Sequence, residues 1–181
     1  MNYYRLLDDI HFRGRWHLGE LRHQDGTAVD LDSGMAVDDA PLHCVVTTSG
    51  VPMEFCLTSF NAPVVSERVA SVVLRLARQS IQPVEVEVEG HGHFVGLNVT
   101  RRVVCLDEKR TYATKWTRQD GRPDKVGRYR MVADLHIDAS SVPAGCHAFR
   151  VWGWEVAMVV SVDMKDLMES QGVAGAVFVP V

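Results

Sequence analysis

The chain has 181 residues, 46% hydrophobic and 23% charged, a composition that is typical of one globular domain and excludes a largely disordered protein. Its formal net charge of −4 is uneven, because residues 1–60 carry 4 Lys and Arg against 9 Asp and Glu. No run of Lys and Arg resembles a nucleic-acid-binding patch, so the sequence argues against direct binding of DNA or RNA.

The N-terminal residues lack the basic start and apolar core of a secretory signal. No apolar run approaches the roughly 18 residues that are needed to cross a bilayer. We therefore expect a cytoplasmic protein without a membrane partner. The cysteines form no CxxC pair and are expected to be free thiols in a reducing compartment; they are Cys44, Cys56, Cys105 and Cys146.

Residues 1–60 contain short apolar runs separated by turn signals such as Asp25-Gly26 and Ser33-Gly34. The frequent turn signals favour short strands and loops over helices. We expect the acidic segment 1–60 to belong to the same domain as residues 61–181. The sequence leaves open whether the segment completes the core sheet or stands apart as a recognition element.

A change of period after residue 65 predicts an amphipathic helix over residues 66–79. Apolar residues recur at the i, i+3, i+4 and i+7 positions that line one helical face. Ser66 is placed to cap the first turn, and Glu67 suits the positive end of the helix dipole. The buried face would consist of Val69, Val72, Val73 and Leu76.

Strict alternation over residues 84–89 predicts a strand with one buried face and one acidic face. The acidic face would carry Glu85, Glu87 and Glu89. A turn at residues 90–93 and further strands at 94–99 and 103–106 would follow. The carboxylates have two interpretations: charges that protect a sheet edge from strand addition, or an acidic surface for a basic partner.

The C-terminal third also reads mainly as strands. Residues 128–138 alternate, with one apolar face that comprises Tyr129, Met131, Ala133, Leu135 and Ile137. Residues 156–160 are apolar on both faces and predict a central, covered strand. A short helix over residues 162–171, capped by Ser161, and a last strand over 176–179 complete an α+β fold made mainly of antiparallel sheet.

Candidate reactive side chains have plain structural explanations. Cys105 follows two valines in an expected strand, and the carboxylates that come after it would raise a thiol pKa, so a buried structural role is favoured over a nucleophile. His91 and His93 could contribute two metal ligands, but no second cluster has suitable spacing. The sequence therefore predicts no catalytic residue, metal site or cofactor.

Two tryptophans near a strand end are candidate interface anchors. Trp152 and Trp154 stand close together, and tryptophan is over-represented among residues that dominate binding energy. Packing in the core is the competing explanation for at least one of them. With Glu85, Glu87 and Glu89 they form the predicted partner-binding set.

Taken together, several short stretches resemble a bacterial immunity-protein family linked to polymorphic toxins. The resemblance lies in the order and spacing of these stretches and extends over residues 61–181. The stretches are Pro63–Val69, Pro83-Val84, Leu97–Val99, Val104–Glu108, Phe149-Arg150, Val159–Ser161 and Gly175–Phe178.

The resemblance implies a non-enzymatic protein that is encoded beside a secreted toxin and neutralises that toxin by binding. The acidic N-terminal third and the glutamate strand would suit a basic toxin domain. Two other functions remain open from the residues alone. One is a small-ligand or glycan sensor that uses Trp152 and Trp154, and the other is a hydrolase that pairs Cys105 with a distant histidine such as His136.

Overall fold

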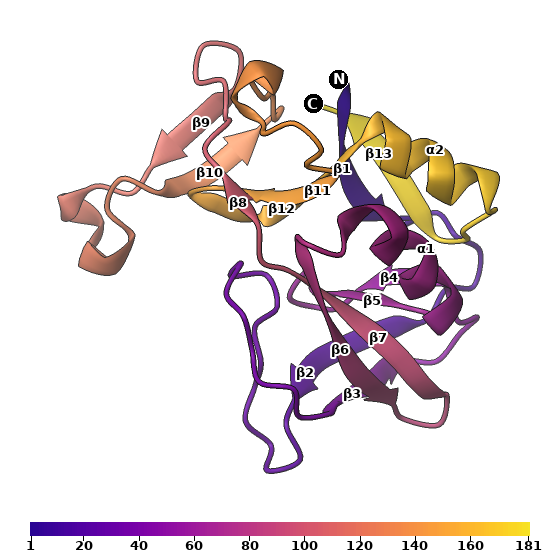
Figure 1. Cartoon of the computed structure of the whole chain (residues 1–181). Coiled ribbons are helices and arrows are strands. Elements are labelled where there is room, and N and C mark those ends of the chain that lie inside the picture. Colours follow the sequence, from indigo (N-terminus) through magenta and orange to yellow (C-terminus); the bar gives the residue numbers. More distant parts are fainter.

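Two β-sheets, two α-helices and a separate two-stranded hairpin make up the fold, which a computed structural model describes over residues 1–181 (Figure 1). Named strand pairs are antiparallel except β3–β6 and β8–β11. The α+β class predicted from the sequence is confirmed, as is the prevalence of antiparallel pairing.

The first sheet joins the two ends of the chain. Its strand order is β13-β1-β12-β11-β8, so the N-terminal strand lies between two C-terminal strands. The fully covered strand predicted at residues 156–160 is β12, which pairs with β1 on one side and β11 on the other. The strands are β1 (Tyr3–Asp8), β8 (Arg102–Val103), β11 (Ala148–Val151), β12 (Trp154–Ser161) and β13 (Ala176–Pro180).

The second sheet has six strands in the order β2-β3-β6-β7-β5-β4 and is nearly closed. Its two edges approach where Leu18 bridges Thr58, and the Ser59 amide donates to the Leu18 carbonyl at 3.1 Å. The strands are β2 (His17–Arg22), β3 (Leu42–Thr48), β4 (Phe55–Leu57), β5 (Pro63–Val65), β6 (Ile81–Val88) and β7 (Gly92–Val99).

Both predicted helices form at the predicted places. Helix α1 spans Glu67–Ala77 and α2 spans Val162–Ser170. The Ser66 hydroxyl accepts from the Val69 amide at 3.3 Å, and the Ser161 hydroxyl accepts from the Met164 amide at 3.2 Å. These caps satisfy amides that have no partner within the helix, which explains why each helix begins there.

Three apolar clusters fill the molecule. One lies inside the six-stranded sheet around Trp16, Leu31 and Val86. A second packs α1 and α2 against both sheets, and a third covers the other face of the five-stranded sheet around Phe149 and Cys105. No helix in the chain combines the length and apolar character that a membrane crossing would require.

The hairpin projects from the body of the molecule (Figure 1). It consists of β9 (Tyr112–Lys115), two short 3-10 turns (Arg118–Asp120 and Pro123–Lys125) and β10 (Tyr129–Ala133). We call residues 109–133 the arm. Only Thr111 within it is buried, so the arm contributes little to the core.

The strand predicted over residues 128–138 is wrong in its length, and its predicted apolar face is buried only at Leu135 and Ile137, beyond the end of the strand. β10 ends just before Asp134, which has a left-handed φ of 56°. Met131, expected inside, is 41% exposed, whereas Val132 packs against the third cluster. The pairing register shifts between Tyr129 and Met131, and no sheet or helix layer covers the arm. The alternation of apolar and polar residues along β10 therefore does not indicate which side chains are buried.

The strand predicted at residues 103–106 is also shorter than expected. Regular pairing stops at Val103, and only a single bridge from Leu106 to Ile137 continues it. Cys105 and Leu135 are nevertheless buried beside this bridge. The apolar character of the segment therefore reflects burial without a continuous strand.

Candidate functional site

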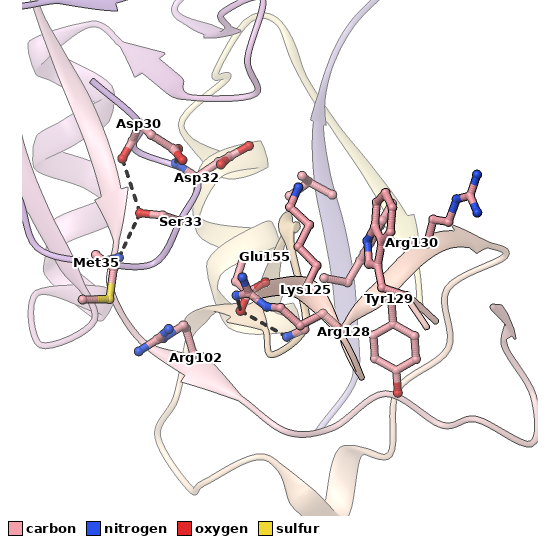
Figure 2. Close-up of a pocket in the computed structure, with 14 residues that line it drawn as sticks. Asp30, Asp32, Ser33, Met35, Arg102, Lys125, Arg128, Tyr129, Arg130 and Glu155 are labelled. Atoms are coloured by element: carbon pink, nitrogen blue, oxygen red, sulfur yellow. Dashed lines mark hydrogen bonds and ion pairs between the residues drawn. The ribbon is translucent and has the colours of Figure 1, made fainter. Parts of the chain in front are cut away.

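A groove of about 540 Å³ opens where the arm faces the loop between β2 and β3. We call residues 23–41 the acidic loop, because they include five Asp and no Lys or Arg. Asp30 and Asp32 lie on one side of the groove, and Lys125, Arg128 and Arg130 lie on the other (Figure 2). The remaining lining residues are Ser33, Met35, Arg102, Trp116, Tyr129, Gly153, Trp154, Glu155 and Val156.

Arg150 anchors the acidic loop to the five-stranded sheet. Its side chain is completely buried, and its guanidinium donates to the Leu31 carbonyl at 2.9 Å and to the Glu155 carbonyl at 2.7 Å. Burial lowers the pKa of Arg150 to about 10, still well above neutral pH, so the side chain remains a cation. One buried charge thus ties the loop to the strand that forms the groove floor.

A second anchor comes from the six-stranded sheet, where Gln82 and Asn98 are paired across β6 and β7. The Gln82 side chain accepts from the Val37 amide at 3.0 Å and donates to the Val37 carbonyl at 2.7 Å. The Asn98 amide group donates to the Met35 carbonyl at 2.8 Å. These bonds satisfy loop backbone groups that would otherwise lack partners, so the loop is held as a defined wall.

Burial raises the pKa of Asp32 to about 7, with further upward contributions from a hydrogen bond with Asp30 and from that residue's charge. The cation of Arg150 acts in the opposite direction but does not overcome the burial. The Asp32 amide donates to the Asp30 carboxylate at 2.7 Å. The groove therefore contains a carboxyl group whose negative charge is poorly stabilised near neutral pH.

Arg102 crosses the loop at Gly34. The glycine has a left-handed φ of 70°, and a Cβ atom there would lie 2.7 Å from the Arg102 Cδ atom. Any other residue at this position would be strained and would displace the arginine. Gly34 thus allows the Arg102 side chain to pack directly on the loop, where it lines the groove without an ion-pair partner.

The arm wall combines cations with an aromatic ring. Lys125 and Arg130 lie 5.5 and 5.2 Å from the ring centre of Trp116. Such cation–π contacts restrict the conformations of the Lys125 and Arg130 side chains and so keep their charges beside the groove. Arg128 donates to the Glu155 carboxylate at 2.7 Å and so connects the arm to β12.

The structure separates the predicted partner-binding residues. Trp154 is half-buried and lines the groove, whereas Trp152 is 45% exposed at the β11–β12 turn and does not line it. Glu85 and Glu87 lie on the six-stranded sheet and Glu89 in the turn after β6, whereas the tryptophans lie on and beside the five-stranded sheet.

The three glutamates are exposed, but the edge-protection interpretation is wrong. β6 lies inside its sheet, between β3 and β7. Glu85 lies 3.3 Å from His93, and Glu87 lies 3.5 Å from His43 on the neighbouring strand. The glutamates therefore form part of an exposed sheet face with interspersed histidines.

The surroundings of Cys105 and His136 do not favour a nucleophile and its base. Burial raises the pKa of Cys105 to about 12, with smaller upward contributions from Cys146 and Asp138, opposite to what a thiolate nucleophile needs. His136, the suggested base, contacts Arg110 and Asp134. No group of three or more His, Cys, Asp or Glu is placed to hold a metal ion.

Sequence reasoning missed the arm wall of the groove. Eight of the 19 Lys and Arg residues fall within residues 109–133, against only Asp120 and Asp124, which gives the arm a formal charge of +6. Averaging the charge over residues 61–181 conceals this concentration. A count in shorter windows reveals it, although no such count places the arm opposite the acidic loop.

The chain matches the model of a known protein family. The family model described as "Immunity protein family (Imm11)" matches residues 20–181, a span that includes both walls of the groove. No curated protein gives a significant match. The family match extends well beyond residues 61–181, over which the sequence stretches carry their resemblance.

Proposed function

Because the chain belongs to the Imm11 immunity protein family, we propose that it protects the producing cell by binding and neutralising a cognate secreted toxin. The family match over residues 20–181 is the observation that carries this proposal. We place the encounter in the cytoplasm and the system among the polymorphic toxins of bacterial competition. Protection would extend to kin that carry the same immunity protein.

The proposed mechanism is non-covalent occlusion of the toxin. A stable interface of standard size buries about 1,600 Å² in total, and a few buried anchors dominate its energy. The groove offers such an anchoring point, because it combines Trp154, Trp116 and side chains of both signs. Chemistry by the immunity protein is not required, which is consistent with the raised pKa of the buried Cys105 thiol.

Two surfaces of the molecule could receive the toxin. The exposed face of β6, with Glu85 and Glu87, and Glu89 in the turn that follows it would suit a basic toxin domain, as the sequence predicts. The groove and arm present a different charge pattern. Charge reversal on each surface distinguishes them, because rim charges chiefly alter the association rate of a complex.

The proposal is tested by expressing the product of the adjacent gene in a bacterial host, with and without this protein. We expect the neighbour to arrest growth alone, and co-expression to restore growth and yield a stable complex on purification. Cys105→Ala should protect as well as the wild type, since the thiol has no role in binding. A toxic neighbour that is neither bound nor neutralised would refute the proposal.

The ligand-sensor alternative has its own measurement. A small molecule that occupies the groove at a hundredfold excess over its dissociation constant would stabilise the fold by about 2.7 kcal/mol. A thermal-shift screen that finds such a ligand, together with failure of the co-expression test, would favour a sensor over an immunity protein.

A further inference from the structure

Charge is strongly segregated in the molecule. The arm has a formal charge of +6, whereas all other residues together have −10. The arm also projects from the body, so its positive charge is concentrated on one projection, which faces the acidic loop across the groove (Figure 1). A protein with net charge −4 therefore presents a locally cationic projection.

Half of the arm's cations are committed to carboxylates within the chain. The pairs are Lys115–Glu108, Arg122–Asp124, Arg128–Glu155 and Arg130–Asp120, at 2.5 to 2.9 Å. The other four, which form no ion pair, are Lys109, Arg110, Arg118 and Lys125. Arg102, in the groove beside the arm, is also exposed and without an ion pair. These five side chains can receive carboxylates from outside the chain.

The arm also exposes apolar surface. Tyr112 is 67% exposed, Val126 is 42% exposed and Met131 is 41% exposed. A hairpin could carry charges simply to prevent strand addition at its edges, but that role does not call for exposed aromatic and aliphatic side chains. Aromatic residues, Met and Arg together are the composition that is enriched at protein–protein interfaces.

The groove argues for a protein partner over a nucleic acid. A polyphosphate backbone repeats its negative charge along its whole length. It would meet Asp30 and Asp32 on the wall that faces the arm and Glu155 on the groove floor. A folded protein can instead direct carboxylates to the arm and keep other groups against the acidic loop.

We infer that the arm and Arg102 form the docking surface for an acidic face of a protein partner. The partner's carboxylates pair with Arg102, Arg118 and Lys125, while its apolar side chains cover Tyr112 and Met131. The inference rests on the proposed function for the identity of the partner, the cognate toxin. It assigns the contact to a surface of opposite charge to the glutamate face of β6.

The test measures association of the purified adjacent-gene product with three forms of the full chain, between about 50 and 500 mM NaCl. One form is wild type, and the second carries Arg118→Glu and Lys125→Glu. The third, a matched control, carries Arg75→Glu and Arg78→Glu, which reverse two exposed cations on and just after α1. Both variants change the net charge equally, so a difference between their association rates cannot come from net charge alone.

We expect the arm variant to associate at least about tenfold more slowly at low salt and to lose most of its salt dependence. The control should stay within about twofold of wild type. Tyr112→Ala should accelerate dissociation while leaving the association rate nearly unchanged. Thermal melts of all variants verify that the fold is retained.

Each contrary result has a distinct meaning. Equal rates for the arm variant and wild type, with slower association of Glu85→Lys/Glu87→Lys, would overturn the docking surface and leave the proposed function intact. Tighter arm-dependent binding to a single-stranded RNA oligonucleotide than to the neighbour would overturn the assignment of a protein partner. No complex with wild type would overturn the proposed function and this inference with it.

Discussion

Arg150 is a single residue that connects the acidic loop to the five-stranded sheet. Its two hydrogen bonds to the carbonyl groups of Leu31 and Glu155 are made by a fully buried cation. Removal of the guanidinium leaves both buried carbonyls without these donors and frees the acidic loop from the sheet. Hydrogen bonds that involve a charged group contribute about 1.5–3 kcal/mol each.

We therefore expect Arg150→Met to lower the free energy of unfolding by about 2–4 kcal/mol, measured by urea denaturation. Arg150→Lys should also destabilise, because an ammonium group cannot reproduce the two-pronged geometry. Arg101→Met, at a neighbouring exposed arginine, serves as the control and should change stability by less than about 0.5 kcal/mol. An Arg150→Met protein as stable as the control would contradict the anchoring role.

Asp32 makes stability depend on pH. Its pKa is raised to about 7 in the folded chain, whereas an unfolded Asp has a pKa near 4. Between about pH 4 and 7 the folded state therefore binds more protons than the unfolded state, and the contribution of Asp32 to the free energy of unfolding falls as pH rises. After allowance for residual solvent, the decrease should be roughly 1–3 kcal/mol.

Asp32→Asn should remove this decrease and make the protein more stable than wild type at pH 8. The measurement is urea unfolding of both proteins at several pH values between 4 and 8. The assignment would be refuted if the free energy of unfolding changed with pH by the same amount in wild type and in Asp32→Asn.

At the scale of elements, the tip of the arm is expected to be dispensable for folding. Its tip, residues 117–126, contains no buried residue, and Trp116 and Gly127 already exchange backbone hydrogen bonds with the opposite side of the hairpin. Replacing the tip by Asn-Gly should cost less than about 1 kcal/mol in the free energy of unfolding. It should nevertheless abolish rapid association with the partner, because Arg118 and Lys125 are removed.

The shortened-arm protein is compared with wild type by thermal unfolding and by stopped-flow association. Loss of cooperative unfolding would show that the arm supports the core, contrary to its low burial. Normal folding with an unchanged association rate would show that the tip takes no part in docking.

Local periodicity predicted elements that pack on a core and failed for the element that does not. Helix α1 packs its apolar face into the second cluster and is capped by a serine. Its hydrophobic period and its cap therefore both predicted the helix correctly. Residues 128–138 show equally clear alternation, which matches burial at Leu135 and Ile137 but not within the arm, where the register shifts after Tyr129 and only Val132 packs against a cluster. Alternation indicates a buried face only where tertiary structure supplies a layer to bury it.

The groove was only partly foreseeable. Trp154 was singled out as a candidate, and the acidic pair Asp30 and Asp32 was visible as local charge. Their meeting with Lys125 and Arg102 depends on Arg150 drawing the loop to the other sheet, 119 residues away in sequence. No local pattern encodes that contact, so the site could not be assembled from spacing alone.

At the scale of the whole molecule, we expect residues 1–60 to be part of a single folding unit. They supply β1, which separates β12 from β13, and β2 to β4, which include both edges of the nearly closed sheet. Deleting them should abolish cooperative unfolding as followed by circular dichroism. A truncated chain of residues 61–181 that still unfolds cooperatively would instead support a detachable recognition element.

Segregated charge also has a consequence for how the molecule moves before contact. A cationic arm on an anionic body forms a large electric dipole. Within about a Debye length, roughly 8 Å at physiological ionic strength, a charged surface exerts a torque on such a dipole and rotates it. Orientation during an encounter is therefore a property of the body as much as of the arm, and neutralising body carboxylates far from any contact would weaken the torque that aligns the molecule.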